Sequence, residues 1–99
     1  PAIMFDEIDT GVSGEISNKM GQIMQNMSQS MQVFAITHLP QIAAKGHTHF
    51  KVYKEDINDV TTTRLVQLNH DDRIVEIAQM LGGINISNSA LAHAKQLLN

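Results

Sequence analysis

Two short, uninterrupted apolar runs stand out near the start of the chain, and each is followed at once by polar residues. The first covers residues 2–5 and ends at Asp6 and Glu7, and the second covers residues 33–36 and leads through a threonine to His38. Continuous apolar runs of this length are typical of parallel strands that are buried on both faces. The pattern therefore predicts two buried strands that deliver polar side chains at their carboxyl ends.

The segment between these runs has helical periodicity. Its apolar residues recur three or four positions apart, with asparagine, glutamine and serine between them: Ile16, Met20, Ile23, Met24, Met27 and Met31. We expect one amphipathic helix from Glu15 to about Met31. Four of these residues form a methionine stripe that suits core packing, and a role at an interface also fits.

Strand, helix and strand together make a βαβ unit, in which the two strands are neighbours and run parallel. Parallel strands end at the same edge of a sheet, and ligands of open α/β sheets bind at that edge. Asp6, Glu7 and His38 are therefore expected to share one site. Gly11 and Gly14 are expected to bracket a tight loop between the first strand and the helix.

The next part of the chain has the signals of a short helix and a hairpin. Pro40 suits the first position of a helix, which we expect to end near Gly46. Two β-rich stretches follow around Val52 and Leu65, and the polar segment 55–59 lies between them. This arrangement predicts a β-hairpin with its turn in the polar segment.

Two helices are expected at the end of the chain. The first has apolar residues at helical spacing from Ile74 to Leu81 and is closed by the glycines at 82 and 83. Ser87 can cap the second helix, because a serine hydroxyl accepts a hydrogen bond from a free backbone N–H of the first turn.

The length allows one small core, so we expect a single domain over residues 1–99. The chain begins with Pro1 directly before an apolar run, which suggests a segment cut from a longer protein. No apolar run approaches the roughly 18 residues that a bilayer crossing needs, and nothing resembles a signal peptide. A soluble, cytoplasmic protein with no membrane partner is expected.

Charge and cysteine content narrow the possible functions. The formal net charge of −3, with only 7 Lys and Arg, argues against strong nucleic-acid binding by this segment alone. The absence of cysteine excludes disulfides and thiolate metal sites. Any contact with DNA would therefore lie elsewhere in a longer protein.

Several ordered segments resemble the ATP-binding cassette heads of the SMC-like, chromosome-maintenance ATPases. Residues 5–14 read Phe-Asp-Glu-Ile-Asp-Thr-Gly-Val-Ser-Gly and are similar to the Walker B and D-loop segment of these heads. Residues 36–43 are similar to their switch-histidine segment, and the resemblance continues through residues 76–83 and 90–94. It implies the α/β fold of a P-loop NTPase head, here one lobe with parallel strands, flanking helices and a later β-hairpin.

The resemblance also implies roles for three residues. Asp6 would hold Mg²⁺ through a coordinated water, and Glu7 would orient and deprotonate the attacking water. His38 would lie near the γ-phosphate as the switch histidine. From spacing alone, the acidic pair also fits a solvated strand end, and the histidine also fits a structural hydrogen bond.

The D-loop would span Asp9 to Gly14, with Asp9, Gly11, Ser13 and Gly14 near the nucleotide of a partner head. The wider superfamily usually has an aspartate near Ser13, and this sequence departs from that pattern. A simple turn from strand to helix describes the same residues without conflict.

The remaining polar residues are assigned no chemistry. We expect them at the surface, in a solvated turn or at a helix start: His47, His49, His70, His93, Glu55, Asp56, Asp71 and Asp72.

In the intact protein, the resemblance implies an ATP hydrolase of DNA double-strand break repair that uses ATP and Mg²⁺ at the bacterial nucleoid. Its partners would be the N-terminal lobe of the same head, a second head in an ATP-sandwiched homodimer, and DNA. The sequence has no Gly-x-x-x-x-Gly-Lys-Ser/Thr loop, so the segment alone is expected to be inactive. Two alternatives stay open: a sister family of SMC-like ATPases, and a non-catalytic module that recruits a partner.

Overall fold

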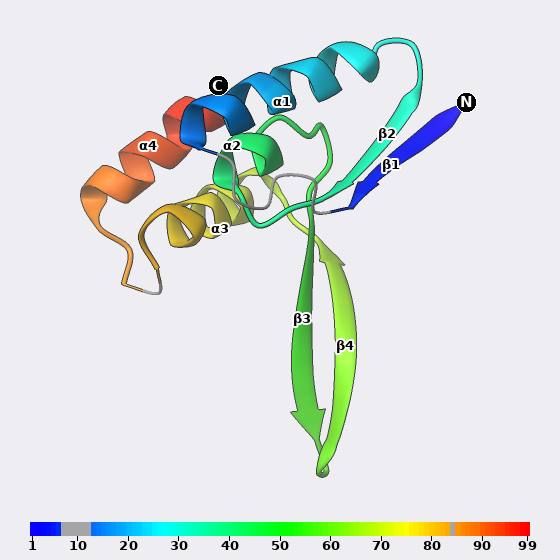
Figure 1. Ribbon diagram of the computed structural model, residues 1–99. Helices are drawn as coiled ribbons and strands as arrows, with labels where there is room; N and C mark the ends of the chain where they lie inside the picture. Colours follow the sequence, from blue (N-terminus) through cyan, green and yellow to red (C-terminus); the bar gives the residue numbers. More distant parts are fainter. Residues whose placement is uncertain (7–12, 84) are drawn as a thin grey trace.

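The first part of the fold is the expected βαβ unit. The computed structural model describes residues 1–6, 13–83 and 85–99 (Figure 1). Strand β1 (Ala2–Asp6) and strand β2 (Gln32–Ile36) pair in parallel, and helix α1 (Gly14–Met27) lies between them in the chain. The parallel pairing that the sequence predicts is therefore confirmed.

The expected burial of these two strands is wrong. The Met4 side chain is 63% exposed, and those of Phe34 and Ile36 are 50% and 49% exposed. The strands form a sheet of two strands, and no described element pairs with their outer edges. A strand of a parallel sheet is buried only when neighbours cover its faces, and the described residues do not supply enough of them.

Helix α1 ends earlier than its periodicity suggests. It begins at the cap Ser13, whose hydroxyl accepts a hydrogen bond from the N–H of Ile16 at 3.3 Å. It ends at Met27, because Ser28 turns its hydroxyl onto the carbonyl of Gln25 at 2.6 Å and the chain then bends toward β2. Serine hydroxyls compete in this way with the helical ladder.

The methionine stripe packs as core material, whereas two isoleucines of α1 do not. Met24 is buried, and the other three methionines of the stripe are half-buried. Ile16 and Ile23 are 51% and 59% exposed. The apolar arc of α1 is thus wider than the face that contacts the rest of the described structure.

Helix α2 (Pro40–Ala43) packs against α1 through Gly21. A Cβ added at Gly21 would lie 3.2 Å from the carbonyl oxygen of Gln41, so a larger residue would require a small shift of α2. The helix begins at proline as expected but is shorter than predicted, because it ends at Ala43 rather than near Gly46.

The hairpin is longer than the sequence indicates. Strand β3 (Phe50–Ile57) and strand β4 (Val60–Gln67) are antiparallel and project away from the helices (Figure 1). Asn58 and Asp59 form the connection with φ angles of 51° and 62°, as a two-residue type I′ turn requires.

The expected turn over residues 55–59 is therefore wrong for its first residues, which belong to β3. Glu55 and Asp56 lie within β3, where Glu55 accepts a hydrogen bond from Arg64 at 3.2 Å and Asp56 accepts one from Thr61 at 2.6 Å. These cross-strand pairs extend the ladder through residues that are polar in sequence.

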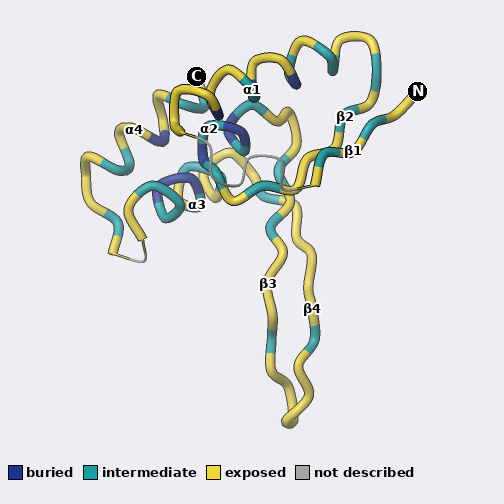
Figure 2. Tube along the Cα trace, in the orientation of Figure 1, coloured by how far each residue is buried: buried dark blue, intermediate teal, exposed yellow. Residues whose placement is uncertain are grey.

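The final two helices form the small core. Helix α3 (His70–Gly82) is capped by Asn69 and ends at Gly83, which has a φ of 82°, and helix α4 (Asn88–Leu98) is capped by Ser87 as predicted. The buried residues that meet here are Ala44, Ile77, Ala78 and Ala94. Figure 2 shows buried stretches of the tube at α2, α3 and α4. Within the described ranges, no helix has the length and apolar character to cross a bilayer.

Candidate functional site

The parallel pairing of β1 and β2 brings Asp6 and His38 to one edge of the sheet. Asp6 is the last residue of β1 and pairs with Ile36, the last residue of β2, so His38 lies two residues beyond the same edge. Both residues are exposed. The predicted common edge is thus confirmed for these two residues, whereas Glu7 lies outside the described residues.

The backbone after β2 is fixed by a local turn. The N–H of Leu39 donates to the hydroxyl of Thr37 at 3.0 Å, and Pro40 then begins α2. This turn holds His38 between the end of the strand and the start of the helix. Its side chain is exposed and is available for a ligand that approaches the edge.

Two of the four predicted D-loop residues are described, and their contacts are those of a helix start. Ser13 caps α1, and the carbonyl of Gly14 accepts a hydrogen bond from the hydroxyl of Ser17 at 3.0 Å. Asp9 and Gly11 lie outside the described residues. The contacts of Ser13 and Gly14 agree with the simpler interpretation of a strand-to-helix turn, and they do not test a role toward a nucleotide.

The described residues supply one part of a magnesium site. Asp6 offers carboxylate oxygens, which are ligands that Mg²⁺ prefers. Among the described residues, no group of three or more His, Cys, Asp and Glu side chains could hold a metal ion. The donor set fits Mg²⁺ only where water and phosphate oxygens complete its shell, as is usual for this ion.

A groove of about 1100 Å³ runs beside His38, between the β1–β2 sheet and the base of the hairpin. His38 lines it, and Asp6 is not among its lining residues. Most of its exposed apolar lining comes from the two sheets: Met4, Phe34, Ile36, Phe50, Val52 and Leu65. The groove is thus an apolar surface that begins at the candidate site.

The prediction of His49 as a surface residue is wrong. Its side chain is half-buried, and its Nδ1 is buried without a hydrogen-bond partner in the described structure. Burial lowers the pKa of His49, Arg73 lowers it further, and Glu76 acts in the opposite direction. His47, His70 and His93 are exposed, as expected.

From the sequence, no role is assigned to Arg73, Glu76 or Lys51, although Arg73 and Glu76 act on the pKa of His49 and Lys51 pairs with Glu76. Lys51 of β3 lies two positions after His49, and Arg73 and Glu76 are three residues apart on α3. These two spacings are the signal that could have suggested a cluster, but nothing in the sequence indicates that the strand meets this helix.

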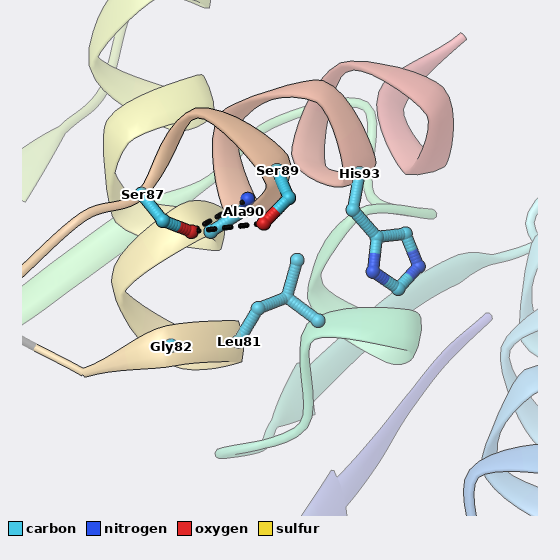
Figure 3. A pocket seen from close by; sticks show the side chains of 6 residues that line it. All are labelled: Leu81, Gly82, Ser87, Ser89, Ala90 and His93. Carbon is cyan, nitrogen blue, oxygen red and sulfur yellow. Dashed lines mark hydrogen bonds between the residues drawn. The ribbon is translucent and has the colours of Figure 1, made fainter.

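A smaller hollow of about 460 Å³ lies between the end of α3 and the start of α4 (Figure 3). Ser87 accepts a hydrogen bond from the N–H of Ala90 at 3.1 Å and lies 3.1 Å from the hydroxyl of Ser89. His93 borders the hollow. The hydroxyl of Ser87 accepts the capping hydrogen bond of α4, and we assign this hollow no catalytic role.

Comparisons with known proteins give a consistent result. No family model matches the chain. It is similar to proteins named "DNA repair protein RecN": 46% identical over 98 residues to that of Xylella fastidiosa (strain 9a5c), 41% over 98 residues to that of Vibrio cholerae, and 40% over 97 residues to that of Bacillus subtilis (strain 168). These matches cover 98–99% of this chain, which spans about 18% of the length of the relatives.

One solved structure has a similar fold. It is described as "Structural biochemistry of ATP-driven dimerization and DNA stimulated activation of SMC ATPases" and is 16% identical, with a TM-score of 0.65. The likeness covers 82% of this chain and 48% of that one. At this identity the likeness shows the fold alone, and the predicted α/β fold class is confirmed.

Proposed function

Since the chain corresponds along its whole length to a segment of the DNA repair protein RecN, we propose that it forms part of the ATP-hydrolysing head of a DNA repair protein. The observation that carries this proposal is the parallel pairing of β1 with β2, because it brings Asp6 and His38 to the carboxyl edge of one sheet. Open α/β folds bind their ligands at this edge.

We assign different roles to the two residues of the acidic pair, Asp6 and Glu7. Asp6 would hold Mg²⁺, and the ion would offset the charge of the phosphates when bound with ATP. Glu7 accepts the proton of the attacking water, for which it must be ionised and within hydrogen-bond reach of that water. The exposure of Asp6 supports this assignment, because a metal-binding carboxylate must be open to solvent or ligand.

His38 acts as a donor toward the terminal phosphate. An imidazole N–H that faces developing charge stabilises the transition state of phosphoryl transfer. The turn through Thr37 and Leu39 supports this role, since it restricts the backbone on both sides of the histidine.

The segment from Asp9 to Gly14 reaches a second head, and two heads enclose ATP between them as a homodimer. Ser13 and Gly14 begin α1 and thereby fix where this segment leaves the body of the lobe. The nucleotide itself is held mainly by another part of the protein, since this sequence has no phosphate-binding loop. We therefore expect the isolated segment to have no measurable ATPase activity.

The N-terminal lobe of the same head covers the groove beside His38. Contiguous apolar surface of this kind is rare on a complete monomer, and the chain spans only about 18% of its relatives. The complete protein then acts in double-strand break repair at the bacterial nucleoid and contacts DNA outside this segment.

The test uses the complete polypeptide with a Glu7→Gln variant. Steady-state phosphate release should fall by about 10²–10⁴-fold, because a general base contributes that much, while Mg²⁺-dependent ATP binding is retained. The matched control is Glu15→Gln, an exposed acid paired with Lys19 on α1, and it should leave the rate unchanged.

Two results would contradict the proposal. Normal hydrolysis by the Glu7→Gln protein would remove its catalytic role. Failure of the unmodified complete protein to bind ATP with Mg²⁺ would favour the alternative of a non-catalytic interaction module, for which the apolar groove would be the binding surface.

A further inference from the structure

The open end of the β3–β4 hairpin, where its two strands meet the helices, forms the root of the hairpin. His49 directly precedes β3, and its carbonyl accepts a hydrogen bond from the N–H of Leu68 at 2.9 Å, which closes the base of the ladder. The hairpin then extends away from the helical part (Figure 1). Its attachment therefore depends on the side chains near His49.

Polar side chains from the hairpin and from α3 meet at this root. Lys51 of β3 and Glu76 of α3 form an ion pair with a separation of 2.9 Å between Nζ and Oε2, and both are more than half-buried. Arg73 of α3 donates from Nη2 to the carbonyl of Ala43 at 3.1 Å. The hairpin, α3 and the end of α2 are thus connected through one cluster, which we define as the root cluster: His49, Lys51, Arg73 and Glu76.

Two nitrogen atoms of the root cluster are buried and have no hydrogen-bond partner in the described structure. They are Nδ1 of His49 and Nε of Arg73. The Nε of Arg73 carries a hydrogen and can only donate, whereas the Nδ1 of a neutral histidine can accept. A neutral His49 is therefore chemically compatible with its surroundings, but a protonated one would add a second unpaired donor.

The carboxylate that favours a charged His49 is already paired, because Glu76 forms an ion pair with Lys51, and the Arg73 cation disfavours a further positive charge. Arg73 and Lys51 are cationic, and Glu76 is the one carboxylate among the described residues that line the adjoining groove. The other titratable side chains that line this groove are Lys45, His47 and His38, and none of them supplies a negative charge. A charge gained by His49 would thus have little compensation.

We propose that neutral His49 holds the β3–β4 hairpin on α3, and that protonation of His49 loosens this joint. The root cluster is then a pH-sensitive attachment for the hairpin. This inference does not depend on ATP hydrolysis, so it can fail while the proposed function stands.

The direction of the pH dependence follows from the environment of His49. Its pKa lies below the ordinary value of 6.5, because burial and Arg73 disfavour the charged form more than Glu76 favours it. The released hairpin therefore binds more protons than the attached one at mildly acidic pH. Attachment is complete above pH 6.5 and weakens as the pH falls below that value.

The experiment measures hydrogen exchange of the Leu68 amide in the complete polypeptide at pH 8 and pH 5, after correction for the intrinsic exchange rate. Its protection should fall at the lower pH, by up to about tenfold for each unit that separates the attached and released pKa of His49. His49→Gln, which stays neutral, should remove this fall. His70→Gln, which changes an exposed histidine at the start of α3, should preserve it.

A second measurement keeps the test decisive if His49→Gln does not fold. The ring of His49 in the unmodified protein should titrate below the ordinary histidine value of 6.5 when it is followed by NMR. Equal protection of the Leu68 amide at both pH values, an undiminished fall in His49→Gln, or a His49 titration at or above pH 6.5 would each overturn the proposal.

Discussion

At the scale of single residues, the described core is centred on one fully buried isoleucine. Ile77 is fully buried, and it packs with Ala44, Ala78 and Ala94 where α3 meets α4 and the end of α2. Half-buried apolar side chains, among them Ile74, Leu91 and Leu97, pack against this cluster. Removing the buried methyl groups of Ile77 would leave a cavity wherever these neighbours do not move into the space.

Ile77→Ala is expected to lower the free energy of unfolding by about 2–5 kcal/mol, because it removes buried methyl groups and leaves a cavity. Val75→Ala on the same helix is the control, since Val75 is 42% exposed and should cost much less. Chemical denaturation of the two variants provides the comparison. Equal losses would mean that Ile77 is not central to the core.

The same scale shows what can be predicted for individual residues. The common edge of Asp6 and His38 is predictable because it follows from strand direction, which the βαβ pattern determines. The environment of His49 is not, because it depends on where the hairpin root meets α3. The exposure of Met4 could not be predicted either, since an apolar run does not reveal which elements pack against it.

At the scale of elements, close contact between α1 and α2 depends on a helical glycine. A Cβ at Gly21 would lie 3.1 Å from Cγ of Lys45 and 3.2 Å from the carbonyl oxygen of Gln41. The first neighbour is a flexible side chain, but the second is backbone and cannot move without shifting α2. Gly82 at the end of α3 differs, because a Cβ there would meet only Ala90 at 3.5 Å, which is ordinary contact.

Gly21→Ala and Gly82→Ala are therefore expected to have opposite effects. Alanine in a helix favours folding by up to about 1 kcal/mol relative to glycine, and Gly82→Ala should gain part of this amount. Gly21→Ala should instead lower the melting temperature, because overpacking costs about 1–3 kcal/mol. The melting temperatures of both variants test these expectations. A higher melting temperature for Gly21→Ala would show that α2 can move to accommodate the added methyl group.

Most elements could be predicted in kind but not in extent. Caps such as Ser87 and Pro40 give the starts of helices, because their chemistry is local. The ends of α1 and of β3 could not be found in this way. The end of α1 depends on the hydroxyl of Ser28, and the length of β3 depends on the cross-strand partner of Glu55. Neither contact leaves a periodic pattern in the sequence.

At the scale of the whole molecule, apolar side chains from two separate sheets border one groove. Phe34 of β2 and Leu65 of β4 are 50% and 65% exposed there. If the groove is covered in the complete protein, these exposed residues become core residues. The segment and the complete protein would then respond differently to the same substitution.

Leu65→Ala is expected to lower the unfolding free energy of the complete protein by about 2–5 kcal/mol, as for a buried leucine. Val60→Ala, at the hairpin tip and 62% exposed, should change it by no more than about 0.5 kcal/mol. Denaturant titration distinguishes the two. A negligible effect of Leu65→Ala would mean that the groove stays open to solvent.

The two sheets of this lobe also differ in how far apart their partners lie in the chain. Only Asn58 and Asp59 separate β3 from β4, whereas residues 7–31 separate β1 from β2. Loop-closure entropy makes a short connection easier to form than a long one, so local pairings arise more readily than distant ones. The hairpin can thus assemble from neighbouring residues, while the edge that unites Asp6 and His38 exists only once remote stretches of the polypeptide have met.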